Sequence, residues 1–179
     1  MIKNRKELNE TLSIERQYYL SKNRLVRIIR YFFKNEYMVI WKYQKLLRKS
    51  EFFYNTNKKI RFMLTNYKKN KYGFKYGFSI NINCFDKGLR IWHIGNVVIN
   101  PDAKIGKFCQ LHGNCCIGNK GIGRNETPII GDYCDIGYGA ILIGNIKIGN
   151  NIKIGAGSVV TKSFEENKAI IVGNPAKHI

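Results

Sequence analysis

Aliphatic side chains recur at every sixth position through the C-terminal part of the chain. The longest uninterrupted series consists of Ile130, Ile136, Leu142, Ile148, Ile154 and Val160. A small or apolar residue stands four positions after each aliphatic residue, and a glycine often follows it directly. Six-residue units of this kind are typical of a solenoid of short parallel strands, in which three units close one triangular coil. The pattern therefore predicts a mostly β domain, a parallel β-helix, over residues 77–179.

An earlier block has the same spacing but begins with a histidine. Counting back in sixes gives the series Ile117, Leu111, Ile105, Ile99 and His93. A regular coil turns this position toward the core, where a polar ring needs a hydrogen-bonding partner. The histidine is thus either a core residue bonded to a backbone carbonyl or a functional group on an irregular coil.

The six-residue spacing is interrupted between Ile117 and Ile130, which lie thirteen positions apart. The segment at about residues 119–129 is rich in glycine, asparagine and charged residues, and it lacks aliphatic side chains at the expected positions. An interrupted solenoid usually extrudes a loop, and such loops often carry function. We therefore expect an extruded loop here.

Residues 1–76 follow a helical pattern instead. The segment RLVRIIRYFF at 24–33 places its apolar residues along one helical face and intersperses arginines. The pattern predicts a basic α-helical N-terminal region. Such helices either pack on their own chain, with Lys and Arg reaching into water, or lie peripherally on an anionic membrane surface.

The basic charge belongs mainly to this helical region. Residues 1–78 hold 20 of the 31 Lys and Arg residues but only 5 of the 12 acidic ones. A basic surface suits phosphate-bearing ligands, anionic lipids or nucleic acid, of which nucleic acid is the least expected. We expect a cytoplasmic protein, with peripheral contact at the inner face of the membrane as an option, since the sequence shows neither a signal peptide nor a run of about 20 apolar residues.

The five cysteines lack the spacing of a metal site or a disulfide framework. Cys109, Cys115 and Cys134 stand four positions after an aliphatic residue, where a small apolar side chain is expected. We therefore expect free thiols and no bound metal.

The hexapeptide units, the loop and the ending IGAGSVVTKSFEENKAIIVGNPAKHI resemble the left-handed β-helix acyltransferases. The closest likeness is to the serine O-acetyltransferase group, in particular its relatives of the polysaccharide-biosynthesis type. The resemblance is strong over residues 73–179, and GNPAKHI is its most specific part. It implies a left-handed β-helix, a homotrimer, acetyl-CoA as the acetyl donor and a hydroxyl group as the acceptor.

His93 falls on the catalytic histidine of that family. A neutral imidazole is suited to accept the proton that leaves the hydroxyl as its oxygen attacks the thioester carbonyl. The resemblance also implies residues that bind acetyl-CoA, which are Asn119, Lys120, Gly121, Tyr138, Gly139, Ala156, Lys162 and Lys177. Trp92, His112 and Asp86 are the expected substrate-side residues.

Two departures from the family pattern bear on the acceptor. Serine acetyltransferases place an aspartate before the histidine, where this chain has Trp92, and an Arg-His pair before the loop proline, where it has Glu126 and Thr127. An indole with a free N–H suits the apolar face of a sugar ring. We therefore predict a sugar hydroxyl as the acceptor, in capsule, lipopolysaccharide or exopolysaccharide biosynthesis.

Three alternatives stay open at this point. They are serine O-acetylation in cysteine biosynthesis, N-acetylation of a nucleotide-linked amino sugar, and a non-enzymatic scaffold. The partner of His93 is open as well. The aspartate that the family uses would fall near Phe78 or Ser79, which cannot serve, and Asp86 is the nearest carboxylate in the sequence.

Overall fold

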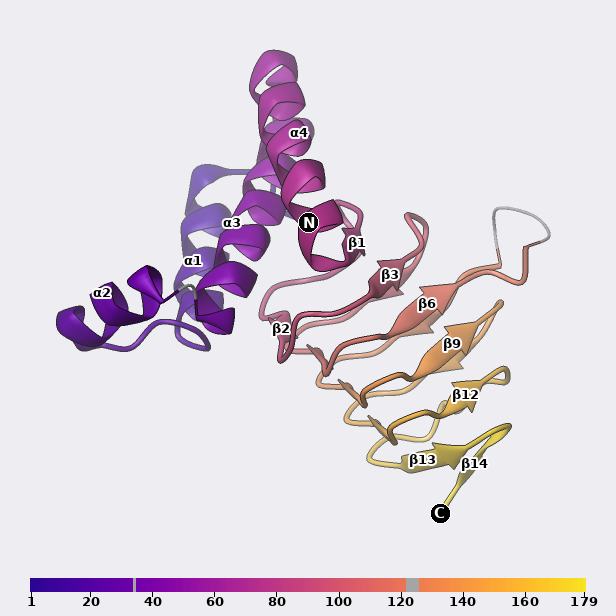
Figure 1. Cartoon of the computed structure of the whole chain (residues 1–179). Helices are drawn as coiled ribbons and strands as arrows, with labels where there is room; N and C mark the ends of the chain where they lie inside the picture. The colour runs from indigo at the N-terminus through magenta and orange to yellow at the C-terminus, as the bar shows by residue number, and fades with distance from the viewer. Residues whose placement is uncertain (34, 122–125) are drawn as a thin grey trace.

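The computed structural model describes residues 1–33, 35–121 and 126–179, and in it a group of helices stands at one end of a coiled ribbon of strands (Figure 1). The helices are α1 (Arg5–Arg16), α2 (Arg24–Phe32), α3 (Glu36–Asn55) and α4 (Lys59–Tyr76). The side chains of Asn4, Asn23 and Asn35 cap the first three helices by accepting backbone N–H groups. Gly77 ends α4 in the left-handed conformation, at φ 78°.

The strands form the three faces of a prism. The first face contains β1 (Phe78–Ile80), β3 (Val97–Ile99), β6 (Cys116–Gly118), β9 (Ile141–Ile143) and β12 (Val159–Val160). The second contains β4 (Lys104–Ile105), β7 (Ile129–Ile130) and β10 (Lys147–Ile148). The third contains β2 (Arg90–Ile91), β5 (Gln110–Leu111), β8 (Asp135–Ile136), β11 (Lys153–Ile154) and β13 (Ile170–Gly173), with β14 (Ala176–His178) antiparallel to β13.

The aliphatic residues that lie six apart stack inside this prism. The series from Ile130 to Val160 is at most 4% exposed, and the small residues four positions later are buried as well. Cys109, Cys115 and Cys134 belong to the latter group, at 0–1% exposure. The predicted left-handed parallel β-helix, preceded by a helical region, is therefore confirmed.

The coil that carries His93 is irregular. Ile91 pairs with Leu111, and Ile99 pairs with Ile117. Ile91 and Ile99 lie eight residues apart, whereas Leu111 and Ile117 lie only six apart. The coil thus holds two extra residues, which widen the corner between β2 and β3. The His93 side chain is 55% exposed there, so its six-residue spacing from Ile99 is coincidental and the core interpretation is wrong.

Helices α1 and α3 cover the open end of the β-helix. The buried Arg48 guanidinium donates to the backbone carbonyls of Phe85 at 2.8 Å and Asp86 at 2.6 Å. The Glu15 carboxylate accepts from the backbone N–H of Gly88 at 3.2 Å. These backbone groups belong to the first coil, which has no preceding coil to pair with, so the polar side chains of the helices take the place of a strand.

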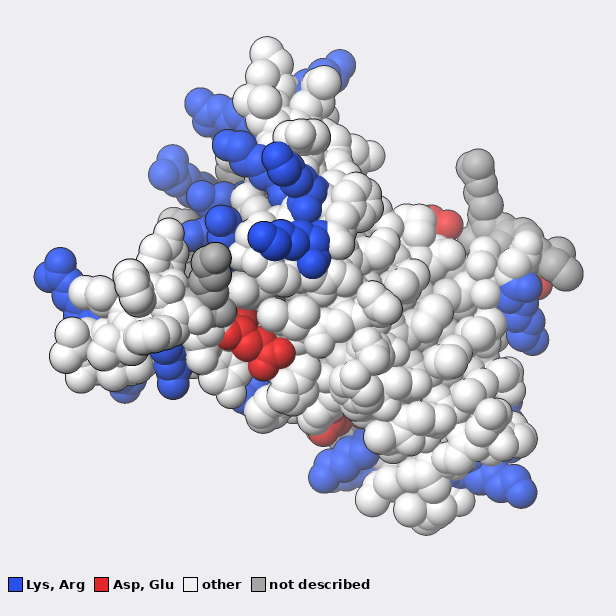
Figure 2. All heavy atoms as spheres, viewed as in Figure 1, with Lys and Arg blue, Asp and Glu red and all other residues white. Residues whose placement is uncertain are grey.

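Helix α2 is packed differently. None of its residues is buried, and Leu25, Ile28 and Phe32 are 63%, 55% and 79% exposed. Lys and Arg side chains gather over the helices on the face shown in Figure 2, as the charge distribution predicts. Among the described residues no helix is long and apolar enough to cross a membrane. Peripheral membrane contact stays a prediction.

Candidate active site

His93 shares its corner of the prism with residues from the next two coils. A Cβ atom built on Gly113 would lie 3.5 Å from the His93 Cβ and 3.3 Å from the Tyr138 ring. The glycine also has φ 111°, which side chains rarely adopt. Asn114 donates to the Tyr138 hydroxyl at 2.6 Å and so holds the phenol in place. The His93 Cβ and the Tyr138 ring thus both border the space beside Gly113.

A carboxylate from the helical region contacts His93. Glu36 is the first residue of α3, and its Oε2 lies 3.4 Å from His93 Nδ1. Its Oε1 accepts a hydrogen bond from the backbone N–H of Ile94 at 2.6 Å. Sequence reasoning missed Glu36. The adjacent Asn-Glu pair marks a helix start, but nothing in the pattern shows that this start packs against a residue 57 positions later.

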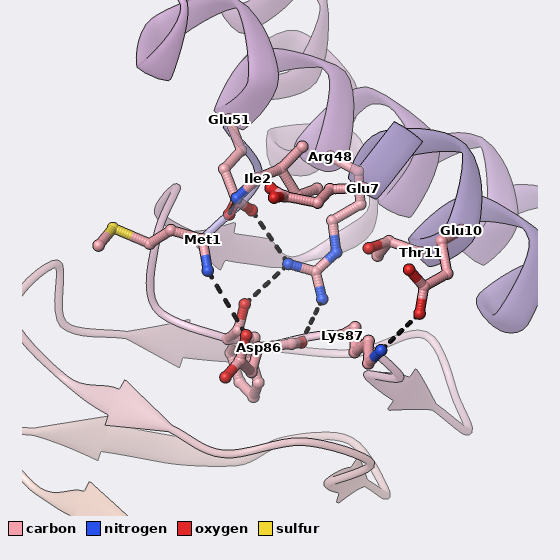
Figure 3. Close-up of a pocket in the computed structure, with 10 residues that line it drawn as sticks. Met1, Ile2, Glu7, Glu10, Thr11, Arg48, Glu51, Asp86 and Lys87 are labelled. Atoms are coloured by element: carbon pink, nitrogen blue, oxygen red, sulfur yellow. Dashed lines mark hydrogen bonds and ion pairs between the residues drawn. The ribbon is translucent and has the colours of Figure 1, made fainter. Parts of the chain in front are cut away.

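Asp86, the carboxylate nearest to His93 in the sequence, lies elsewhere. Its side chain is 3.4 Å from the Met1 ammonium group, in a polar pocket beside α1 and α3 (Figure 3). Its backbone carbonyl accepts from Arg48 at 2.6 Å. The structure thus does not bring Asp86 to His93, and the carboxylate at the imidazole is Glu36 instead.

The indole of Trp92 is occupied by contacts within the chain. The Arg90 guanidinium carbon lies 3.4 Å from the ring centroid, and the His112 ring stacks on it at 5.4 Å. The indole N–H donates to Gln110 Oε1 at 2.9 Å, while His112 Nε2 lies 2.7 Å from Asp135. The expected free N–H is therefore absent, and the argument from Trp92 for a sugar acceptor loses its basis.

The predicted acetyl-CoA residues other than Lys177 divide between two corners. Tyr138, Gly139 and Ala156 lie on the His93 corner, where the first-face strands begin, and the Gly139 N–H donates to the Gly113 carbonyl at 3.0 Å. Asn119, Lys120, Gly121 and Lys162 lie where these strands end. Lys177 is exposed on β14. The structure therefore does not gather them into one site within a single chain, and residues 122–125 of the expected loop lie outside the described residues.

Cys84, Cys115 and Cys116 contribute packing rather than reactive thiolates. Burial raises the pKa of Cys84 to about 11, and it also raises the pKa values of Cys115 and Cys116. These three thiols are therefore protonated at neutral pH and poor nucleophiles. The part of the chain that the structure describes contains no group of three or more potential metal ligands from His, Cys, Asp and Glu.

Gly113→Ala should damage the site through crowding. The new methyl group would crowd the Tyr138 ring, which lies 3.3 Å from the built Cβ, and the alanine would keep a strained φ of 111°, so we expect a loss of about 1–3 kcal/mol in the free energy of unfolding. Gly157→Ala is the matched control, because Gly157 also has positive φ, 66°, but has no atom within 4 Å of its built Cβ. Denaturant unfolding of both variants tests the prediction, and equal losses would contradict it.

In sequence, the chain is similar to several curated proteins over part of its length. No family model matches the chain. The serine acetyltransferase of Buchnera aphidicola subsp. Schizaphis graminum is 34% identical over 107 residues, which cover 57% of this chain and 41% of the relative. That of Buchnera aphidicola subsp. Acyrthosiphon pisum is 31% identical over 133 residues, which cover 73% of this chain and 47% of the relative. The bifunctional protein GlmU of Wolbachia pipientis wMel is 33% identical over 97 residues, which cover 52% of this chain and 22% of the relative.

The chain thus spans less than half the length of these curated relatives. Solved structures resemble it over nearly its whole length. Soybean serine acetyltransferase matches with a TM-score of 0.78 and 24% identity, covering 97% of this chain and 70% of that one. A serine acetyltransferase in complex with CoA matches with a TM-score of 0.73 and 19% identity, covering 98% of this chain and 71% of that one. The likeness establishes a shared fold that includes the helical region, and the relatives point to the serine acetyltransferase group rather than to the polysaccharide type.

Proposed function

We propose that this chain is an acetyl-CoA-dependent O-acetyltransferase in which His93 is the general base. The observation that carries the proposal is the exposed His93 ring, in contact with Glu36, on a fold shared with serine acetyltransferases. A coil that aimed His93 into the core would place its ring out of reach of a substrate. The irregular corner gives the ring access to a substrate.

The reaction needs two things from the protein: a general base for the acceptor hydroxyl, and a surface that places the two substrates against each other. The acceptor oxygen attacks the thioester carbonyl while its proton passes to the imidazole, and the tetrahedral intermediate then expels the CoA thiolate, which takes the proton back. The activated acyl group belongs to acetyl-CoA. His93 supplies the proton acceptor, and the neighbouring corner residues supply the surface on which the substrates meet.

Serine is the acceptor that we propose first. The relatives that are 31% and 34% identical are serine acetyltransferases, and the structure removes the argument from Trp92 for a sugar. A sugar hydroxyl is the second candidate. Glu126 and Thr127 still stand where the family carries an Arg-His pair, and Thr127 is only 8% exposed.

We further propose that acetyl-CoA binds between two copies of the chain. The predicted acetyl-CoA residues other than Lys177 occupy both ends of the first-face strands, so one chain alone offers two half-sites. The homotrimer that the resemblance implies would set the 119–121 segment of one copy against the His93 corner of the next.

The acceptor is tested by thiol release from acetyl-CoA with the purified chain. We expect the highest kcat/KM with serine and no release above background with alanine, which lacks the hydroxyl group. A panel of monosaccharides and nucleotide-linked amino sugars completes the experiment. A higher kcat/KM with a sugar would move the assignment to the second candidate, and an amide product would show N-acetylation instead.

A further inference from the structure

The two oxygens of Glu36 have different partners, and this fixes how the carboxylate faces the site. Oε1 accepts the Ile94 N–H at 2.6 Å, whereas Oε2 lies 3.4 Å from His93 Nδ1. Since Ile94 directly follows His93, one carboxylate holds both the backbone and the ring at this corner. The longer contact is at the limit of a hydrogen bond, and such contacts often tighten when substrate binds.

The packing of α3 determines where Glu36 lies. Asn35 caps the helix by accepting the Tyr37 N–H at 3.0 Å, and the helix N-terminus favours a negative side chain in the first turn. Further along α3, Gln44 donates to the Leu89 carbonyl at 2.7 Å and so ties the helix to the coil that leads into His93. The helical region thus brings a carboxylate to a histidine of the β-helix.

An ionised carboxylate only accepts hydrogen bonds, so its contact with Nδ1 is favourable when Nδ1 carries a proton. In a neutral imidazole, a proton on Nδ1 leaves the lone pair on Nε2. We infer that Glu36 is a positioning residue that holds neutral His93 in the Nδ1–H form, with Nε2 directed to the acceptor hydroxyl. The inference rests on the proposed function, and it assigns to the helical region a part in the reaction besides closing the β-helix.

Glu36→Gln is the informative substitution. The amide oxygen would keep the hydrogen bond from the Ile94 N–H, which leaves the amide NH₂ facing His93 Nδ1. A donor at that place favours a lone pair on Nδ1 and moves the proton to Nε2, as a carboxylate-to-amide change does in a catalytic triad. We expect kcat to fall by roughly 10²-fold, with little change in the KM for acetyl-CoA.

The tautomer is read directly by ¹⁵N NMR of ring-labelled histidine in the full chain. The chain has three histidines, so His93→Ala identifies the His93 signals. We expect the neutral His93 ring to be mainly Nδ1–H in the parent chain and mainly Nε2–H in Glu36→Gln. Glu166→Gln, at an exposed position of the β-helix, is the matched control and should leave the signals unchanged.

The spectroscopic and kinetic results separate the two proposals. An unchanged His93 tautomer in folded Glu36→Gln would overturn the positioning role, even if the chain transfers acetyl groups. A parent chain that transfers no acetyl group to any hydroxyl would overturn the proposed function, while the NMR measurement still decides whether Glu36 controls the ring. A fall in kcat without a tautomer change would also count against the inference.

Discussion

His93→Ala should fold like the parent chain and lose roughly 10²- to 10⁴-fold in kcat for acetyl transfer. The ring is 55% exposed, so its removal opens no cavity in the core. Without it, the acceptor hydroxyl has no general base to take its proton as the thioester is attacked. Initial rates of thiol release at saturating acetyl-CoA measure the effect, and circular dichroism checks the fold.

His112→Ala is the matched control for this variant. His112 lies one coil away, is 32% exposed, and is already engaged by Asp135 and by stacking on Trp92. We expect it to keep far more activity than His93→Ala. A folded His93→Ala variant with full activity would contradict the mechanism, as would an equal loss in both variants.

Arg48→Ala should cost about 3–5 kcal/mol in the free energy of unfolding. The guanidinium is 1% exposed and lies 2.7 Å from Glu15 and 3.0 Å from Glu51. Burial opposes its charge, but these two carboxylates outweigh burial and raise the pKa of Arg48 above its ordinary value. Removing it leaves two buried carboxylates without their cation and two carbonyls of the first coil without their donor.

Lys87→Ala is the control, because Lys87 forms an ion pair at the same end of the β-helix, with Glu10, but at 37% and 49% exposure. An exposed pair of this kind contributes about 0–1 kcal/mol. Urea unfolding of both variants gives the comparison. If Arg48→Ala were no less stable than Lys87→Ala, the helices would not stabilise the first coil through this buried network.

The β-helix was predictable because its pattern is local and repeated. Each six-residue unit presents the same inward positions, so spacing alone identified the buried aliphatic residues and three of the four buried cysteines, Cys109, Cys115 and Cys134. The two extra residues between Ile91 and Ile99 were not predictable, because His93 happens to stand six positions before Ile99 and so continues the series, whereas the inward residue of the preceding strand is Ile91.

The site was predictable only in part, for a physical reason. His93 could be identified because the family resemblance assigns a role to its position. Glu36 could not, because it contacts His93 only through the packing of α3 on the first coil. Trp92 is the opposite case, a residue for which the sequence suggested a role that its contacts in the structure do not support. Its type suggested a sugar platform, but the contacts with Arg90 and His112 depend on neighbouring side chains that no spacing rule reveals.

O-acetyl transfer with His93 as the base is tested most directly by following a labelled acetyl group from acetyl-CoA into product, with the purified full chain and serine. We expect one O-acetyl ester for each CoA thiol released by the parent chain, and a loss of both products with His93→Ala. A folded parent chain that forms no acetyl ester with serine or with any sugar hydroxyl would contradict it.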